Sequence, residues 1–190
     1  MKRWLGGMAL VLALSACSTV PVVEPSAATQ VQASGEFVLN GRVAIRHNGD
    51  RQSAGLHWTH RRASDEILLL GPLGQTAARV YRDGFGATLE DGSRRYQAED
   101  AASLMEKVLG WQLPLDGLPD WVLARPQPGS AAEIENDAAG RLARLRQSGW
   151  EIRYPRYADE TPGSLPTRLE LQRADLQVQL LIDEWKFIAP

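Results

Sequence analysis

Closely spaced hairpin turns are the sequence feature that most restricts the fold of this chain. Asn48-Gly49, Asp83-Gly84 and Asp91-Gly92 each separate two short runs in which apolar and polar residues alternate. Such dipeptides readily adopt the positive φ angles that tight hairpin turns require. With further turns at residues 63–65 and 71–74, six strands are expected between residues 37 and 97, with no helix among them. This spacing excludes a βαβ arrangement and predicts an antiparallel meander.

Two amphipathic helices are expected after the meander. The first follows Glu99-Asp100, ends at Gly110 and carries apolar residues at helical spacing, namely Leu104, Met105, Val108 and Leu109. The second has Asp116 as its expected N-cap and Pro119 in its first turn, before an apolar side made of Leu118, Trp121, Val122 and Leu123. Alternating strands return between residues 133 and 182. The order predicts a mostly β, α+β fold in which two helices cover one face of a curved antiparallel sheet.

Two of the expected strands, at residues 67–70 and 180–182, are apolar on both faces. The helices can cover only one face, so the other needs a second layer, a partner or a ligand. A pocket between sheet and helices would suit a hydrocarbon chain, because each buried CH₂ contributes about 0.8 kcal/mol. A filled core without a cavity is the alternative, and composition alone favours it.

The first of these apolar strands runs directly into Gly71-Pro72-Leu73-Gly74. Proline in the second position and glycine in the fourth fit a type I turn. That geometry places Leu73 at the tip, where side chains normally point into solvent. The alternative is that Leu73 folds back against its own hairpin.

The first 34 residues have the pattern of a bacterial lipoprotein signal followed by a tether. A basic start and an apolar stretch too short to span a bilayer precede Leu14-Ser15-Ala16-Cys17, which matches a lipobox and contains the only cysteine of the chain. We expect a signal peptide at residues 1–16, an acylated Cys17 with a flexible tether to residue 34, and one folded domain at residues 35–190. A conventional signal peptide cleaved near Ala16 is the alternative. Ser18, where inner-membrane lipoproteins favour Asp, points to the outer membrane.

The sequence offers no recognisable catalytic or metal-binding pattern. His47, His57 and His60 all fall in the first two expected strands, and no G-x-S-x-G, H-E-x-x-H or P-loop motif is present. The single cysteine excludes an internal disulfide, and a net charge of -2 gives no basic patch for nucleic acid. We therefore expect a binding protein without metal or cofactor, not an enzyme. A catalytic pair contributed by distant segments is the enzyme alternative.

Short segments spread over the whole folded part occur together in one family. They include Phe37-Val38-Leu39-Asn40-Gly41-Arg42-Val43-Ala44, Gly71-Pro72-Leu73-Gly74, Gly110-Trp111-Gln112-Leu113-Pro114-Leu115, Gly149-Trp150, Leu165-Pro166 and the final Trp185. In this order, and together with the lipobox, they resemble the LolB family, the outer-membrane receptors of the bacterial lipoprotein-localisation pathway.

The resemblance implies an open, incomplete antiparallel β-barrel covered on its concave side by short helices, with an apolar cavity between them. This cavity would accept acyl chains of lipoproteins from a soluble, LolA-like periplasmic carrier of the same fold. The receptor would then release them into outer-membrane lipid without nucleotide hydrolysis. Strand parity and helix faces predict the lining, although a one-residue register error would reverse it. The expected lining residues are Val43, Leu56, Trp58, Leu68, Leu70, Leu104, Val108, Leu118 and Trp121.

The resemblance also implies a role for the turn after the apolar strand. In the family, the loop between the third and fourth strands carries a protruding leucine that places lipoproteins in the membrane. Leu73 occupies that place here, and Gly71, Pro72 and Gly74 set the loop geometry. The expected protein is a lipid-anchored monomer that faces the periplasm. The alternative function is a structural or scaffold outer-membrane lipoprotein with a filled core and no ligand.

Overall fold

The computed structural model describes residues 35–110 and 115–188, which form one eleven-stranded antiparallel sheet. The predicted signal peptide, Cys17 and the tether lie outside these residues. The strands are β1 (Phe37–His47), β2 (Asp50–Arg61), β3 (Ser64–Leu70), β4 (Thr76–Asp83), β5 (Gly86–Asp91), β6 (Arg94–Ala98), β7 (Ala132–Asn136), β8 (Leu142–Gln147), β9 (Trp150–Tyr157), β10 (Pro166–Arg173) and β11 (Leu176–Phe187). Two helices, α2 (Ala101–Leu109) and α3 (Leu118–Val122), connect β6 to β7. The predicted meander, helices and second meander are thereby confirmed.

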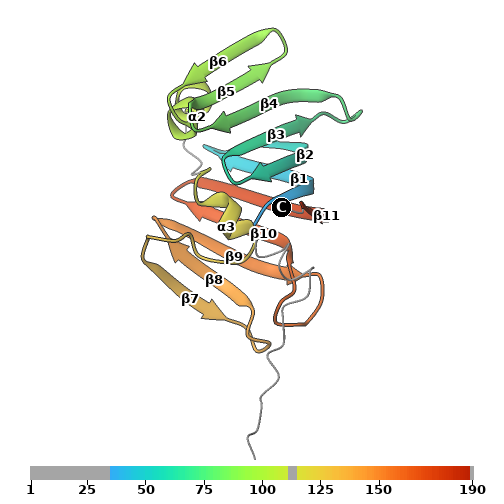
Figure 1. Ribbon diagram of the computed structural model, residues 1–190, viewed down its shortest axis with the longest axis vertical. Helices are drawn as coiled ribbons and strands as arrows, with labels where there is room; N and C mark the ends of the chain where they lie inside the picture. The colour runs from blue at the N-terminus through green and yellow to red at the C-terminus, as the bar shows by residue number, and fades with distance from the viewer. Residues whose placement is uncertain (1–34, 111–114, 189–190) are drawn as a thin grey trace, which may run out of the picture.

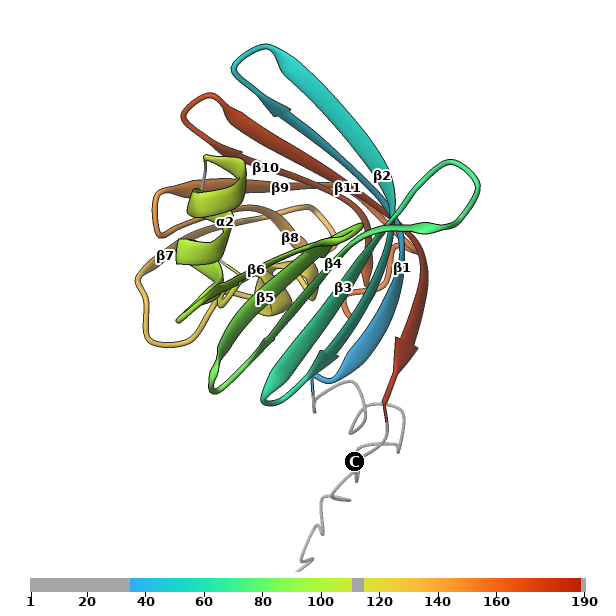
Figure 2. The same cartoon turned by 90° about the horizontal axis from the view of Figure 1, so that it is seen from above.

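The sheet is open because its two edge strands do not pair with each other. The order is β6-β5-β4-β3-β2-β1-β11-β10-β9-β8-β7, so the first and last strands of the chain lie together in the middle (Figure 1). Figure 2 shows the sheet curling around the helices, which lie on its concave side. The predicted fold, a mostly β incomplete barrel with a helical cover, is confirmed.

Gly41 allows the central pair of strands to approach closely. The register between β1 and β11 shifts between Asn40 and Gly41, which forms a β-bulge. A Cβ added at Gly41 would lie only 2.1 Å from the carbonyl oxygen of Leu181. No other residue fits here without moving the β11 backbone, so glycine is required at the bend.

The two helices begin in different ways. The Asp100 carboxylate accepts a hydrogen bond from Ser103 N at 2.7 Å and caps α2, which ends at Gly110 in the left-handed region. This backbone hydrogen bond lowers the pKa of Asp100. The N-cap of α3 is Gly117, with no side-chain cap, so the prediction for Asp116 is wrong. Asp116 instead forms an ion pair with Arg82 on β4. No helix in the described part of the chain is long and apolar enough to cross a membrane.

Because neighbouring strands are antiparallel, their connections fall at two opposite ends of the sheet. We call one end the base; it carries the start of β1, the β2–β3 turn at Arg62-Ala63 and the β4–β5 turn at Gly84-Phe85. We call the other end the mouth; it carries the β1–β2 turn at Asn48-Gly49 and the β3–β4 loop at residues 71–75. In Figure 2 the base is at the bottom, and the β3–β4 loop projects to the right.

Candidate functional site

An apolar cavity lies between the concave face of the sheet and the helical cover. It has a volume of about 100 Å³, and the described side chains that line it are all apolar. These are Val43, Ile45, Leu56, Trp58, Ile67, Leu69, Val80, Met105, Leu115, Leu118, Leu171, Val178 and Leu180. Such a lining suits a hydrocarbon chain rather than a polar ligand. The filled-core alternative, which expected no cavity here, is therefore wrong.

On each strand, alternate side chains point toward the cavity or toward the outer face of the sheet, and this alternation separates the expected lining residues into two groups. Of the residues expected to line the acyl-chain cavity, Val43, Leu56 and Trp58 lie along this cavity, and so does Leu118 at the start of α3. The prediction for Leu68 and Leu70 is wrong: β3 pairs Leu68 with His57 and Leu70 with Gly55, on the outer face of the sheet. Ile67 and Leu69 point inward instead, opposite Trp58 and Leu56. A run of four apolar residues carries no alternation, so the sequence held no signal for the correct choice.

Three predicted helix positions pack beside the cavity instead of lining it. Leu104 and Trp121 are fully buried in the core, and Val108 is half-buried against it. The Trp121 ring lies 6.3 Å from that of Trp150, and its Nε1 donates to Gln147 Oε1 at 2.8 Å. The cover contributes Met105 and Leu115, which the sequence analysis did not place in the cavity. Helical spacing identified the apolar face of each helix, but not which residues on that face line the cavity and which pack in the core beside it.

Exposure differs among the side chains that line the cavity. Leu56, Trp58 and Leu118 are buried, whereas Val43 and Ile45, nearer the mouth on β1, and Leu69, opposite Leu56, are only half-buried. Towards the base the cavity is closed by Trp58, whose ring meets that of Phe37 edge-on at 5.0 Å. The cavity is therefore closed at the base, and the half-buried part of its lining lies on β1 and β3.

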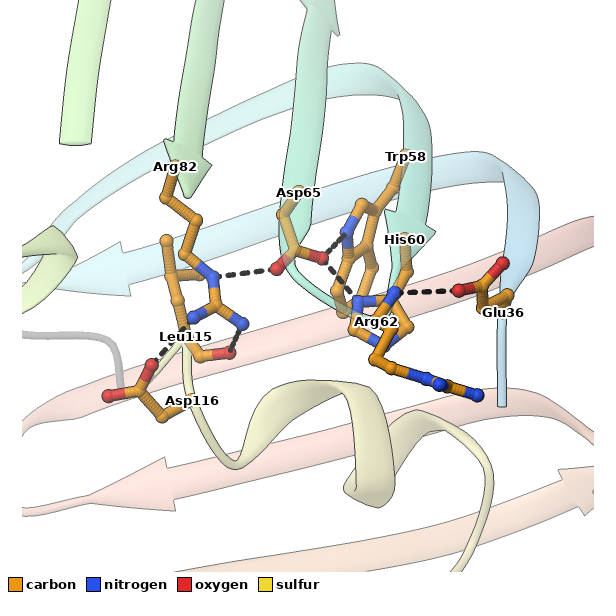
Figure 3. A network of polar contacts seen from close by, with 8 residues as sticks. All are labelled: Glu36, Trp58, His60, Arg62, Asp65, Arg82, Leu115 and Asp116. Carbon is orange, nitrogen blue, oxygen red and sulfur yellow. Dashed lines mark hydrogen bonds and ion pairs between the residues drawn. The ribbon is translucent and has the colours of Figure 1, made fainter. Parts of the chain in front are cut away.

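A buried polar network fastens the helical cover to the sheet at the base (Figure 3). Asp65 is 2% exposed, and its carboxylate accepts hydrogen bonds from Trp58 Nε1 at 2.7 Å and from Arg82 Nε at 2.6 Å. His60 Nδ1 lies 2.7 Å from the same carboxylate and forms a hydrogen bond with it. Arg82 also donates to the carbonyl oxygen of Leu115 at 3.3 Å and to the Asp116 carboxylate at 2.7 Å. The segment leading into α3 is thus bound to β4, and through Asp65 to β2.

In the sequence Asp65 lies next to Glu66, just after the β2–β3 turn, where carboxylates commonly serve the turn. A buried carboxylate requires partners such as these, so its role follows once the strand pairing is known. Glu66 points to the outer face and pairs with Arg79. Within the described residues no group of three or more His, Cys, Asp or Glu side chains could hold a metal ion.

The β3–β4 loop holds Leu73 out of the protein. Gly74 N donates to Gly71 O at 2.9 Å, and Gly74 has φ 79° while Leu73 does not have a positive φ. This is the predicted type I turn, followed by a left-handed glycine. The Gln75 side chain accepts from Leu73 N and lies against Gly71, where an added Cβ would come within 2.4 Å of it. Leu73 is 93% exposed, so the alternative in which it folds back is wrong.

The outer face of the sheet offers a larger but different depression. It has a volume of about 310 Å³ over β1, β11, β10 and β9, and its lining includes Arg46, Arg51, Glu151, Arg153 and Glu170. Charged side chains of both signs make this surface unsuited to an acyl chain. The apolar cavity is therefore the candidate binding site.

Comparison with known proteins assigns this arrangement to a family. The family model described as Outer membrane lipoprotein LolB matches residues 35–185. The chain belongs to the LolB family. An outer-membrane lipoprotein LolB from Azoarcus sp. (strain BH72) is 39% identical over 191 residues, covering 98% of this chain and 97% of the relative. The LolB protein of Pseudomonas aeruginosa (strain PAO1) is 44% identical over 149 residues, covering 78% and 73%. The family expected from the sequence is thus confirmed.

Solved structures with low sequence identity share the fold of this LolB family member. A LolA superfamily protein from Nitrosomonas europaea has a TM-score of 0.52 at 10% identity, covering 87% of this chain and 94% of that one. A DUF1329 family protein from Desulfovibrio piger has a TM-score of 0.53 at 8% identity, covering 83% and 88%. At these identities the likeness concerns the half-barrel fold alone.

Proposed function

We propose that this protein is an outer-membrane receptor that accepts lipoproteins from a soluble, LolA-like periplasmic carrier and passes them to the membrane. The acyl chains of the cargo would occupy the apolar cavity during transfer. The observation that carries the proposal is that the cavity and the exposed loop belong to one hairpin. Leu69, near the end of β3, lines the cavity, and Leu73, four positions further along the same hairpin, projects from the mouth. A chain leaving the cavity would therefore emerge beside a side chain suited to lipid.

The anchoring of the protein belongs to the same proposal. The lipobox at Cys17 supports an acylated N-terminus, with residues 18–34 as a tether and residues 35–190 as one domain. More than one acyl chain would hold the protein firmly to the outer membrane, on its periplasmic side. The protein would act as a monomer. It would also act without catalysis, because apolar side chains line the cavity.

Cargo binding requires the cover to move. Pockets that hold ligands of ordinary size have volumes of about 300–1,000 Å³, and the cavity here has about 100 Å³. Helix α2 packs on β5 and β6, while the segment leading into α3 is fastened to Arg82 at the base. We expect α2 to shift at the mouth and the base to stay in place. Transfer would follow the difference in acyl-chain affinity between carrier, receptor and membrane, since a ligand moves only as far as differential binding drives it.

Leu73 would contact the bilayer during release. Burial of one leucine side chain contributes about 1.5–3 kcal/mol, which biases a tethered domain toward the membrane but does not anchor it. Leu68 and Leu70 lie half-buried on the outer face of β3 and extend apolar surface toward this loop. The contact is therefore expected to involve the outer side of the β3–β4 hairpin.

The variant Leu73→Glu tests this role. We expect transfer of a lipoprotein from carrier to receptor to remain within about twofold, because the cavity is unchanged, and incorporation into liposomes to fall at least about tenfold, because a carboxylate resists burial in lipid. Ser93→Glu, at the exposed β5–β6 turn of the same end, is the matched control and should incorporate normally. Normal incorporation by Leu73→Glu would remove the role assigned to Leu73.

A further inference from the structure

Phe85 is the most exposed large apolar side chain among the described residues, at 99%. It lies at the tip of the β4–β5 turn, directly after Asp83-Gly84. The Asp83 carboxylate accepts a hydrogen bond from Phe85 N at 2.8 Å, which orders the turn. Gly86 follows with φ 148°, and a Cβ there would lie 2.8 Å from the carbonyl oxygen of Ala98. Phe85 thus projects into water from a hydrogen-bonded turn, and the activity proposed above does not use it.

Phe85 lies at the base, at the opposite end of β4 from Leu73. Strand β4 has eight residues, and at about 3.3 Å per residue the two side chains are separated by roughly 26 Å. One contact area cannot include both side chains when the sheet stands upright on a membrane. Phe85 therefore belongs to a surface of its own.

The base is also the end from which the chain leads back to Cys17. Phe37 begins β1 opposite His60, and Arg62 N donates to the Glu36 carboxylate at 2.9 Å, so the tether joins the domain beside the β2–β3 turn. Between Glu36 and the β4–β5 turn lie three to four strand spacings of about 4.8 Å, or roughly 17 Å. Figure 2 shows the β2–β3 turn and the β4–β5 turn at the same end of the sheet as the start of β1. Phe85 therefore lies at the end of the domain where the tether would join it.

Exposed cations accompany Phe85 at this end. Arg61 and Arg62 are both exposed at the β2–β3 turn, next to the β4–β5 turn in the sheet. Aromatic rings prefer the headgroup level of a bilayer, and arginines near a membrane surface are attracted to lipid phosphates. The tether would hold this surface near the membrane, so that its effective concentration at the bilayer is high. A soluble partner protein has no such tether to this surface. A bilayer is therefore favoured over a protein as the occupant.

We propose that Phe85, with Arg61 and Arg62, is a second bilayer contact, which rests the base on an anionic lipid surface. In this orientation the mouth points away from the membrane and is open to the carrier. Release through Leu73 then requires the domain to tilt. Phe85 would contact the membrane while cargo is received, and Leu73 would contact it while cargo is delivered. This inference rests on the proposed lipid anchor, but on neither acyl-chain binding nor the role of Leu73.

The test uses the mature, acylated protein in vesicles of phosphatidylethanolamine and phosphatidylglycerol. Gly84→Cys accepts an environment-sensitive fluorophore next to Phe85, because a Cβ at Gly84 meets no atom within 4 Å. The acylated Cys17 sulfur is bonded and takes no label. Ser93→Cys, exposed at the mouth, is the matched control. We expect headgroup-located quenchers to reduce the fluorescence at position 84 at least about threefold more than at position 93, since the adjacent ring is buried in lipid.

Adding Phe85→Ser to the Gly84→Cys protein should remove this difference. Arg61→Ser with Arg62→Ser should reduce the difference and make it less sensitive to salt, because the screened attraction to lipid phosphates is gone. Equal quenching at positions 84 and 93, or shielding at position 84 only when carrier is added, would overturn the proposal; the second result would make this surface a carrier contact.

Lipoprotein incorporation is measured on the same vesicles, so that two failures can be told apart. Normal incorporation without quenching at position 84 refutes this inference alone. A protein that does not remain on the vesicles refutes it together with the proposed anchor.

Discussion

The two ends of the half-barrel are held together by different kinds of interaction. At the base, Asp65 joins β2, β3 and β4, and Arg82 extends the network to the cover. Towards the mouth, the cavity is bounded by aliphatic side chains such as Val43, Ile45 and Val178. Hydrogen bonds are directional and costly to leave unmade when buried, whereas dispersion attraction between methylene groups is non-directional. An acyl chain can therefore take the place of aliphatic neighbours at the mouth, but it cannot replace the hydrogen-bonding partners of Asp65.

In the proposed function, this difference between the two ends would let one small domain bind and release a hydrocarbon chain without nucleotide hydrolysis. Hydrogen bonds at the base would hold the strand register and the position of the α3 segment. Towards the mouth, the aliphatic side chains would contact either each other or an acyl chain. Helix α3 is fastened to the second half of the sheet, since Tyr154 OH on β9 donates to the Trp121 carbonyl at 2.9 Å. Helix α2 packs on β5 and β6, at the opposite edge of the sheet, through apolar side chains such as Leu104. The more weakly held part of the cover is thus α2.

Removal of the Asp65 carboxylate should give the largest effect on stability. In Asp65→Ala the side chains of Trp58, His60 and Arg82 lose a buried partner, so we expect a loss of about 3–5 kcal/mol in the free energy of unfolding. Urea unfolding followed by tryptophan fluorescence measures it. Glu66→Ala is the matched control, since its ion pair with Arg79 is largely on the surface, and should cost less than about 1 kcal/mol. Equal losses in both variants would mean that the base is not the fixed end.

Filling the cavity should have a smaller effect on stability but a clear effect on binding. In Leu69→Trp the indole would occupy space in the cavity. We expect the affinity for a fluorescent fatty-acid probe to fall about tenfold, while overpacking costs about 1–3 kcal/mol. Leu68→Trp changes the neighbouring position on the outer face and should leave probe affinity unchanged. If Leu68→Trp weakened the probe more than Leu69→Trp, the inward assignment of β3 would be reversed.

Features fixed by local backbone chemistry could be predicted from the sequence. The Asn48-Gly49 turn, in which both residues have positive φ, the bulge at Gly41 and the exposed Leu73 all follow from what glycine, asparagine and proline allow at those positions. The apolar run at residues 67–70 marked a strand with two apolar faces. Its two outward leucines then extend the surface of the Leu73 loop.

Features that depend on long-range packing could not be predicted. The inward parity of β3 is set by its pairing with β2, and the role of Asp65 by the approach of Trp58, His60 and Arg82. Asp116 had the local pattern of a helix cap, but the nearby Arg82 offers a charged partner instead. A helix cap contributes about 1 kcal/mol and an ion pair at a largely exposed carboxylate contributes no more, so the local pattern could not decide between them. These residues all lie where strands meet each other or the cover, and their partners are distant in the sequence.

The pH dependence of stability should belong to the base and not to the cavity, which is lined by apolar side chains. At the base, the Tyr157 hydroxyl on β9 donates to the Leu142 carbonyl, and burial raises the pKa of Tyr157 to about 12. The unfolded value is about 10. A raised folded-state pKa contributes stability that is complete below pH 10 and is lost as the pH rises toward 12.

From pH 9 to pH 11 we therefore expect the wild type to lose more stability than Tyr157→Phe. The difference should be less than about 1 kcal/mol, because the Tyr157 ring is partly exposed. Urea unfolding at each pH measures it. Parallel losses in the two proteins would assign the alkaline sensitivity to other groups, such as the buried Tyr154, whose pKa is also raised by burial.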